Sequence, residues 1–135
     1  MTEALALLLE LASPATPVTR ARAVALAPII ERAPADLRRL LAAVAWKESN
    51  YNAAAVGKRG EVGAWQVAPT GWARTLCRDG FRTPRANCRC AARILRYGAR
   101  RCGSVEGALR FYGSGNCAGG ARYAARVMEV INVHR

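Results

Sequence analysis

The segment Pro34–Ser49 reads PADLRRLLAAVAWKES, and residues 50–67 after it read NYNAAAVGKRGEVGAWQV. The larger apolar residues of the first segment recur at steps of three and four, which places them on one helix face: Leu37, Leu40, Leu41 and Val44. Glu48 follows Val44 by four residues and lies on the same face. The pattern predicts a helix over residues 34–48 that carries a carboxyl group toward the core, directly before a glycine-containing loop.

This position affects the protonation of Glu48. Burial disfavours the charged form of a carboxyl group and raises its pKa. A carboxyl group that keeps its proton near neutral pH is what a general acid requires. The structural alternative is a carboxylate that ends its helix in a salt bridge with an arginine. Glu48 is therefore the candidate catalytic acid.

The rest of the chain also has the pattern of helices. Apolar spacing and capping residues predict helices over residues 2–11, 19–32 (interrupted or kinked at Pro28) and 69–76. Three further helices follow: one starts at Thr83, one starts at Ser104, and the last contains Tyr123. The expected fold class is mainly α, with one small irregular lobe containing short β pieces after residue 48. A chain of 135 residues suffices for one domain. We expect N-terminal helices in residues 1–33 and a catalytic core in residues 34–135.

The charge is strongly positive and uneven. The net charge is +12, and 19 of the 21 basic residues are arginine. Residues 1–73 carry 8 basic and 6 acidic residues, whereas residues 74–135 carry 13 basic and 3 acidic ones. A basic half of this kind favours an anionic partner such as nucleic acid, phospholipid or an acidic wall polymer.

The N-terminal residues do not have the pattern of a classical signal peptide. The apolar run Ala4–Leu9 has no basic residue before it, and Glu3 and Glu10 flank it. No apolar run has the length of a membrane span, so we expect no stable membrane insertion.

Five cysteines lie in the second half: Cys77, Cys88, Cys90, Cys102 and Cys117. Disulfides, free buried thiols and a zinc site are all open at this point, although Cys88-x-Cys90 is not the usual C-x2-C spacing of structural zinc. The odd number leaves at least one free thiol or an intermolecular bond. Cys77 and Cys88 flank a polar loop, which makes them one candidate pair for a disulfide across it, and the pairing stays open.

Four motifs occur in one order: Glu48-Ser49, Gly60-x-x-Gly63-x-x-Gln66, the stretch ALRFYGSG at residues 108–115, and Tyr123. Over about residues 37–130 the chain resembles the soluble lytic transglycosylase family, which shares its lysozyme-like fold with goose-type lysozymes. The resemblance implies an enzyme that cleaves peptidoglycan glycan between N-acetylmuramic acid and N-acetylglucosamine, in the periplasm or cell wall, without a cofactor. It implies that Glu48 acts as acid and then as base, and that an anhydromuramic end forms.

The resemblance also assigns supporting roles. Ser49 would lie near the substrate N-acetyl group, Gln66 would hydrogen-bond sugar, and Tyr112 would position the cleft or the acid. Tyr123 would contact Glu48 or the substrate. We also expect Trp65 to supply an apolar floor and Tyr51 to line the cleft, and Asn87 to cap the helix after the lobe.

Two departures leave alternatives open. The family often has Gly-Leu-Met-Gln and Ala-Tyr-Asn-Ala-Gly, where this chain has Gly63-Ala64-Trp65-Gln66 and Phe111-Tyr112-Gly113-Ser114-Gly115. Asn116 is a candidate to take the place of the asparagine that is missing at position 113. Glu61 adds a carboxylate inside the loop: it either activates water, as the second acid of a hydrolytic lysozyme would, or makes a structural contact.

A different class of protein fits the charge alone. Arg89, Arg93, Arg96 and Arg100 share one predicted helix face, as in a small nucleic-acid-binding domain. A nucleic-acid-binding domain would leave Glu48-Ser49 unexplained, so we do not expect nucleic acid as the partner. A further alternative is an inactive structural virion protein, and the intact Glu48 argues against it. His134 is the only histidine, which argues against histidine-based catalysis or a metal site. We expect delivery by a phage particle or phage tail protein, holin-assisted release or a secretion system.

Overall fold

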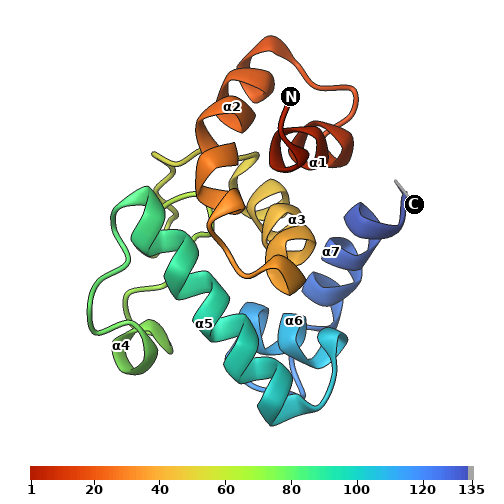
Figure 1. Ribbon diagram of the computed structural model, residues 1–135. Coiled ribbons are helices and arrows are strands. Elements are labelled where there is room, and N and C mark those ends of the chain that lie inside the picture. Colours follow the sequence, from red (N-terminus) through yellow and green to blue (C-terminus); the bar gives the residue numbers. More distant parts are fainter. Residues whose placement is uncertain (134–135) are drawn as a thin grey trace.

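The computed structural model describes residues 1–133 and is mainly helical, as predicted (Figure 1). Its elements are α1 (Glu3–Leu11), α2 (Pro17–Glu31), the short 3-10 helix η1 (Ala35–Leu37), α3 (Arg38–Ser49), α4 (Ala73–Leu76), α5 (Pro84–Cys102), α6 (Val105–Ser114) and α7 (Ala121–Val133). His134 lies outside the described residues. No helix within residues 1–133 is long and apolar enough to cross a membrane.

Hydroxyl side chains start four of these helices. The predicted caps Thr2, Thr83 and Ser104 each accept a hydrogen bond from the backbone amide three residues later. A fourth cap was missed: Thr16 accepts from the amide of Thr19, so α2 begins at Pro17 rather than at residue 19. The helix also passes through Pro28 without interruption, so the predicted interruption is wrong, while the alternative of a kink stays a prediction.

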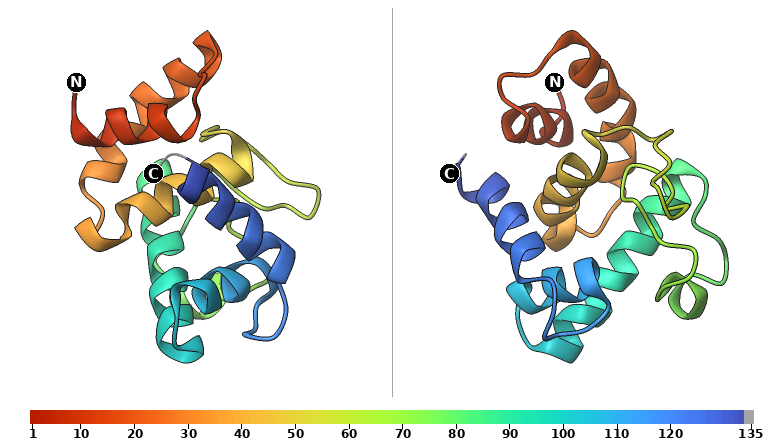
Figure 2. Two further views of the ribbon diagram at one scale, coloured as in Figure 1. Left: turned by 90° about the vertical axis from the view of Figure 1, so that its right-hand side faces the viewer. Right: turned by 180° about the vertical axis from the view of Figure 1, so that it is seen from behind.

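Helix α3 lies at the centre of the fold, packed against α1, α2, α5 and α7. Its residues from Leu41 to Ala45 have no exposed surface. Pro34 and the 3-10 turn precede it, so the α-helix starts four residues later than the sequence predicts. In the side view of Figure 2, α3 begins near the α5 side of the molecule and ends on the opposite side, where the chain enters the loop after Ser49.

Residues 50–72 form the irregular lobe that the sequence predicts. Within it the described chain has turns and two isolated antiparallel bridges, Val56 with Val62 and Val62 with Val67. The lobe makes backbone hydrogen bonds of its own in its turns and at these two bridges. Side chains from the helices also bind its backbone and hold it in place.

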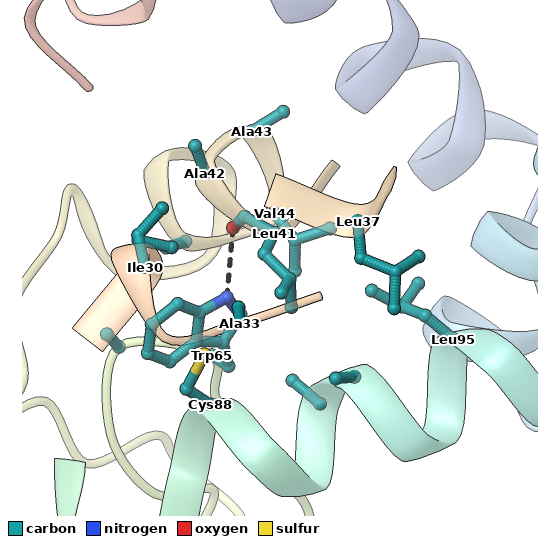
Figure 3. Packing of buried hydrophobic residues seen from close by; sticks show 14 of the residues in the cluster. Ile30, Ala33, Leu37, Leu41, Ala42, Ala43, Val44, Trp65, Cys88 and Leu95 are labelled. Atoms are coloured by element: carbon teal, nitrogen blue, oxygen red, sulfur yellow. Dashed lines mark hydrogen bonds between the residues drawn. The ribbon is translucent and has the colours of Figure 1, made fainter. Parts of the chain in front are cut away.

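Two disulfides join the elements of the basic half, Cys77–Cys90 and Cys102–Cys117. The candidate Cys77–Cys88 pairing is wrong, and Cys88 is a free, buried thiol. Cys88 and Cys90 are two residues apart on α5 and so face different directions. Cys90 faces Cys77 at the end of α4, whereas Cys88 lies in the core beside Trp65 (Figure 3). The disulfide at Cys90 also excludes the Cys88–Cys90 zinc alternative.

Candidate active site

Glu48 lies in the last turn of α3 and is half-buried. Burial is the largest influence on its carboxyl group and raises its pKa, while Tyr123 and Lys47 lower it and the Glu61 carboxylate raises it. The net shift is upward. Glu48 therefore keeps its proton to a higher pH than an exposed glutamate, as a general acid needs to.

The chain turns away sharply after Glu48. Asn50 ends α3 in the left-handed conformation with φ 53°, and Tyr51 follows with φ 65°. Asparagine tolerates this region of backbone space better than most residues. The turn leaves the Glu48 carboxyl group at the junction of the helix and the lobe rather than inside a continuous helix.

Asn87 of α5 is the polar anchor of the lobe. Its side-chain Nδ2 donates to the carbonyl oxygens of Val62 (2.8 Å) and Phe81 (2.9 Å), and its Oδ1 accepts from the amide of Trp65 (3.0 Å). Gly63 packs directly on it, because a Cβ atom at Gly63 would lie 2.4 Å from Asn87 Oδ1. Thr83 caps α5 instead, so the expectation of Asn87 as a cap is wrong, and its role is to fix the lobe.

Two further motif residues bind the same stretch of backbone. The Ser49 hydroxyl lies 2.8 Å from the carbonyl oxygen of Ala64 and accepts from the amide of Asn52 (3.0 Å). The Tyr112 hydroxyl donates to the carbonyl oxygen of Trp65 at 2.6 Å. Burial raises the pKa of Tyr112 well above its ordinary value, so it remains a donor. These contacts tie the lobe to α3 and α6. Contact of Ser49 with an N-acetyl group stays a prediction.

Gln66 and Glu61 meet beside Gly57 within the lobe. A Cβ atom at Gly57 would lie 2.7 Å from Gln66 Oε1 and 2.9 Å from the Glu61 carboxyl carbon. Gln66 Nε2 donates to the carbonyl oxygens of residues 55 (3.2 Å) and 63 (2.9 Å). Glu61 Oε1 accepts from the amide of Arg59 at 2.7 Å. The Gln66 Oε1 atom and the second Glu61 oxygen have no such bond among residues 1–133, so they are available to a sugar or a water.

Tyr123 reaches the site from α7. Its ring stacks on Tyr112 with centroids 6.3 Å apart. It also fills the space above Gly113, where a Cβ atom would lie 2.6 Å from Tyr123 Cδ1. The absence of the family's asparagine at position 113 thus lets Tyr123 approach.

The Tyr123 hydroxyl lies close enough to Glu48 to lower the pKa of that carboxyl group. Even so, it is the one buried side-chain polar atom without a hydrogen-bond partner of ordinary geometry among the described residues. Burial first, and the Glu48 charge second, raise the pKa of Tyr123 well above its ordinary value, so the hydroxyl keeps its proton. Catalytic hydrogen bonds are often long in unliganded sites. The hydroxyl is therefore a free donor beside the acid.

Two expected substrate contacts are corrected. Trp65 has no exposed surface, and its indole Nε1 donates to the carbonyl oxygen of Leu41 at 2.9 Å inside the core (Figure 3). Tyr51 is 1% exposed, and its hydroxyl donates to the carbonyl oxygen of Leu8 at 2.7 Å. Neither ring offers a surface to a sugar, because each is packed between helices. Both residues hold α3 against its neighbours.

Sequence reasoning missed one charged neighbour of the acid. Lys47 Nζ lies 5.7 Å from the centre of the Tyr123 ring, and its charge lowers the pKa of Glu48. Its position directly before Glu48 was the available signal. The Asn116 Oδ1 atom accepts from the amides of Ala118 and Gly119 in its own loop, and its role as a substitute for the missing asparagine stays a prediction. Residues 1–133 contain no cluster of three or more metal-ligating side chains.

The comparison with protein families gives a match that agrees with this geometry. A family model described as the transglycosylase SLT domain matches residues 28–126, from the end of α2 into α7. The match includes α3, the lobe, α5 and Tyr123. Neither the curated proteins nor the solved structures gave a significant match.

Proposed function

The chain belongs to the transglycosylase SLT domain family, lytic transglycosylases that cleave peptidoglycan, and we propose that Glu48 performs this cleavage as acid and then as base. The bond cut is the one between N-acetylmuramic acid and N-acetylglucosamine. The single observation that carries the proposal is the half-buried Glu48 at the end of α3, with a raised pKa and an unpaired Tyr123 hydroxyl beside it.

The proposed reaction has two proton transfers. Protonated Glu48 gives its proton to the glycosidic oxygen, and the bond from that oxygen to C1 of the muramic acid breaks, with the neighbouring N-acetyl oxygen supporting C1. The Glu48 carboxylate then takes the proton of the C6 hydroxyl of the same sugar, and O6 bonds to C1. Glu48 ends protonated, as it began, and no water is consumed.

The neighbours of Glu48 support both steps. Burial favours the protonated form that the first step needs. The Tyr123 hydroxyl can donate to the carboxylate that forms between the steps, which limits the cost of charging a half-buried group. Gln66 lies on the lobe and Ser49 of α3 binds the lobe backbone, and we propose that sugar hydroxyl and N-acetyl groups bind at these two residues.

A Glu48→Gln variant tests the assignment. Purified wild type and variant are incubated with peptidoglycan sacculi, and the released fragments are analysed by mass spectrometry. We expect anhydro-ended fragments from wild type and a rate about 10²–10⁴-fold lower from the variant. A Glu129→Gln variant, at an exposed position on α7, is the matched control and retains the wild-type rate. A Glu48→Gln variant with more than a tenth of the wild-type rate would exclude Glu48 as the acid.

A hydrolytic lysozyme reaction is the second candidate, and one observation favours it. The Glu61 carboxylate raises the pKa of Glu48, so the two groups lie within electrostatic reach, and one Glu61 oxygen has no hydrogen bond among residues 1–133. A base in that position would activate water. Water-ended fragments that disappear in a Glu61→Gln variant would establish this reaction in place of the transglycosylase one.

We also propose that residues 1–33 and 34–135 act as one domain. Tyr51 binds the backbone of α1, and Arg39 of α3 lies 3.6 Å from Glu10 and 3.4 Å from the carbonyl oxygen of Ile131. The two disulfides favour an oxidising compartment such as the periplasm or outer wall. Delivery there by a phage or secretion system stays a prediction.

A further inference from the structure

A groove lies between the end of α2, η1, α4 and α5, with a volume of about 590 Å3. Its floor is formed by buried and half-buried apolar side chains: Ile29, Ala33, Leu37, Leu76, Ala92 and Tyr97. Ala33, Leu37 and Cys88 belong to the core around Trp65, so the groove is the outer side of that core (Figure 3).

The groove is separate from the site at Glu48. Leu37 lines it directly before α3, and Glu48 comes 11 residues later, or about 16 Å along the helix axis. In Figure 2 the two ends of α3 lie on different sides of the molecule. A molecule bound in the groove would leave the Glu48 side open.

Arginines line the groove along its whole length: Arg32 from the end of α2, and Arg85, Arg89, Arg93, Arg96 and Arg100 from α5. The five on α5 recur at steps of three and four and so form one stripe about 22 Å long. This stripe is the one that, from sequence alone, fitted a nucleic-acid-binding face. The structure places it beside an apolar floor.

Only two carboxylates balance these six guanidinium groups. Asp79 pairs with Arg93 (2.5 Å) and more distantly with Arg89 (3.9 Å), and Asp36 pairs with Arg96 (2.6 Å). Arg32, Arg85 and Arg100 have no ion pair within residues 1–133. The groove therefore has an excess of four positive charges around an apolar floor.

We propose that this groove binds an acidic amphipathic helix of a partner protein. A helix of about 15 residues matches the stripe in length, its apolar face fits the floor, and its flanking carboxylates reach the arginines. An anionic lipid needs cations at one end only, whereas here they are spread along the groove. A nucleic acid needs phosphate contacts and leaves the apolar floor unused.

The test is fluorescence anisotropy with a labelled 16-residue peptide that has leucines at i, i+3, i+4 and i+7 spacing and glutamates on both flanks. A scrambled isomer of the same composition is the peptide control. We expect wild type to bind the amphipathic peptide at least about tenfold more tightly than the scrambled one. An Arg85→Glu/Arg100→Glu variant is expected to lose about tenfold in affinity.

Two further variants distinguish binding in the groove from a general attraction between the basic protein and the acidic peptide. Ala92→Phe fills the floor without changing charge and is expected to weaken the peptide. Arg20→Glu/Arg126→Glu makes the same charge change outside the groove and leaves the affinity unchanged. All variants should keep wild-type sacculus cleavage, which shows that they fold and separates this test from that of Glu48.

Three outcomes would overturn the proposal. One is equal affinity for the scrambled peptide, and another is an equal loss in the Arg20→Glu/Arg126→Glu control, which would reduce the effect to bulk charge. The third is no binding of the peptide together with binding of tetradecyl phosphate or a short DNA duplex that the groove variants weaken. That result would assign the groove to lipid or nucleic acid.

Discussion

The helices and the lobe of this molecule meet at Glu48, and they are held in place in partly different ways. The helices pack through apolar side chains in one cluster that extends from Ala4 on α1 to Ile131 on α7. Residues 50–72 add Tyr51, Ala64, Trp65 and Val67 to that cluster. They are also fixed by hydrogen bonds from side chains of neighbouring elements, chiefly Asn87, Tyr112 and Ser49. Apolar packing tolerates small shifts, whereas hydrogen bonds fix atoms within a few tenths of an ångström.

That difference changes how the motif residues are understood. Several residues that the family resemblance marks as substrate-facing in fact bind lobe backbone, as Gln66 does through its Nε2 atom. A motif in this family therefore indicates where the lobe must be fixed as well as where a sugar binds. Glu48 and Tyr123 differ from these residues, because their polar atoms lie close to each other and the Tyr123 hydroxyl has no hydrogen bond of ordinary geometry to the described residues.

Removing the polar anchor should have the largest combined effect on stability and cleavage. Asn87→Ala leaves the amide of Trp65 and two carbonyl groups without their partner, and we expect the free energy of unfolding to fall by about 2–4 kcal/mol. Hydrogen–deuterium exchange should rise selectively in residues 53–67, and cleavage of sacculi should fall more than the folded fraction does.

A matched variant in the helical core sharpens this contrast. Leu109 of α6 has no exposed surface, and Leu109→Ala should cost about 2–5 kcal/mol. Its folded molecules should keep a protected lobe and normal cleavage. Exchange that rises equally over all elements in Asn87→Ala would show that the lobe is not a separately fixed part.

Removing the free hydroxyl should have a smaller, more specific effect. Tyr123→Phe keeps the ring over Gly113 but loses the donor, so stability should change little while the rate at the pH optimum falls about tenfold. Because the hydroxyl lowers the pKa of Glu48, its loss should raise that pKa further and move the alkaline limb of the rate profile to higher pH. Tyr97→Phe on α5 is the control and should leave the profile in place.

The smallest effect concerns the stability of the fold. The folded-state pKa of Glu48 is raised, so the folded protein holds a proton that the unfolded chain has released, and stability falls as pH rises from the ordinary glutamate pKa to the raised one. Glu48→Gln removes this loss. Thermal unfolding should show the variant more stable than wild type at neutral pH and equal to it in acid. A stability difference between wild type and variant that does not grow through this pH window would contradict the raised pKa.

The sequence predicted the parts of the fold that local patterns determine. The caps at Thr2, Thr83 and Ser104 and the stripe that leads to Glu48 follow from relations between residues three or four apart, and the irregular lobe follows from its glycines. Local patterns do not report the rotation of one helix against another. For that reason Cys88 is the candidate partner of Cys77 from sequence, whereas the structure pairs Cys77 with Cys90.

The burial of the aromatic residues near the site could not be predicted from the sequence either. Trp65 and Tyr51 follow the acid in sequence, and an aromatic ring that packs in a core has the same sequence signal as one that binds a sugar. Their burial depends on α1 and α5, which lie far away in the chain. The arginine stripe of α5 similarly needs the end of α2 opposite it before it becomes a groove.

The most direct test of the central claim is digestion of sacculi in water enriched with heavy oxygen. If Glu48 takes its second proton from the substrate's C6 hydroxyl, mass spectrometry will show anhydro ends without heavy oxygen, and Glu48→Gln will release almost none of them. New muramic acid ends that each carry one heavy oxygen atom would contradict this account and assign the second step to water.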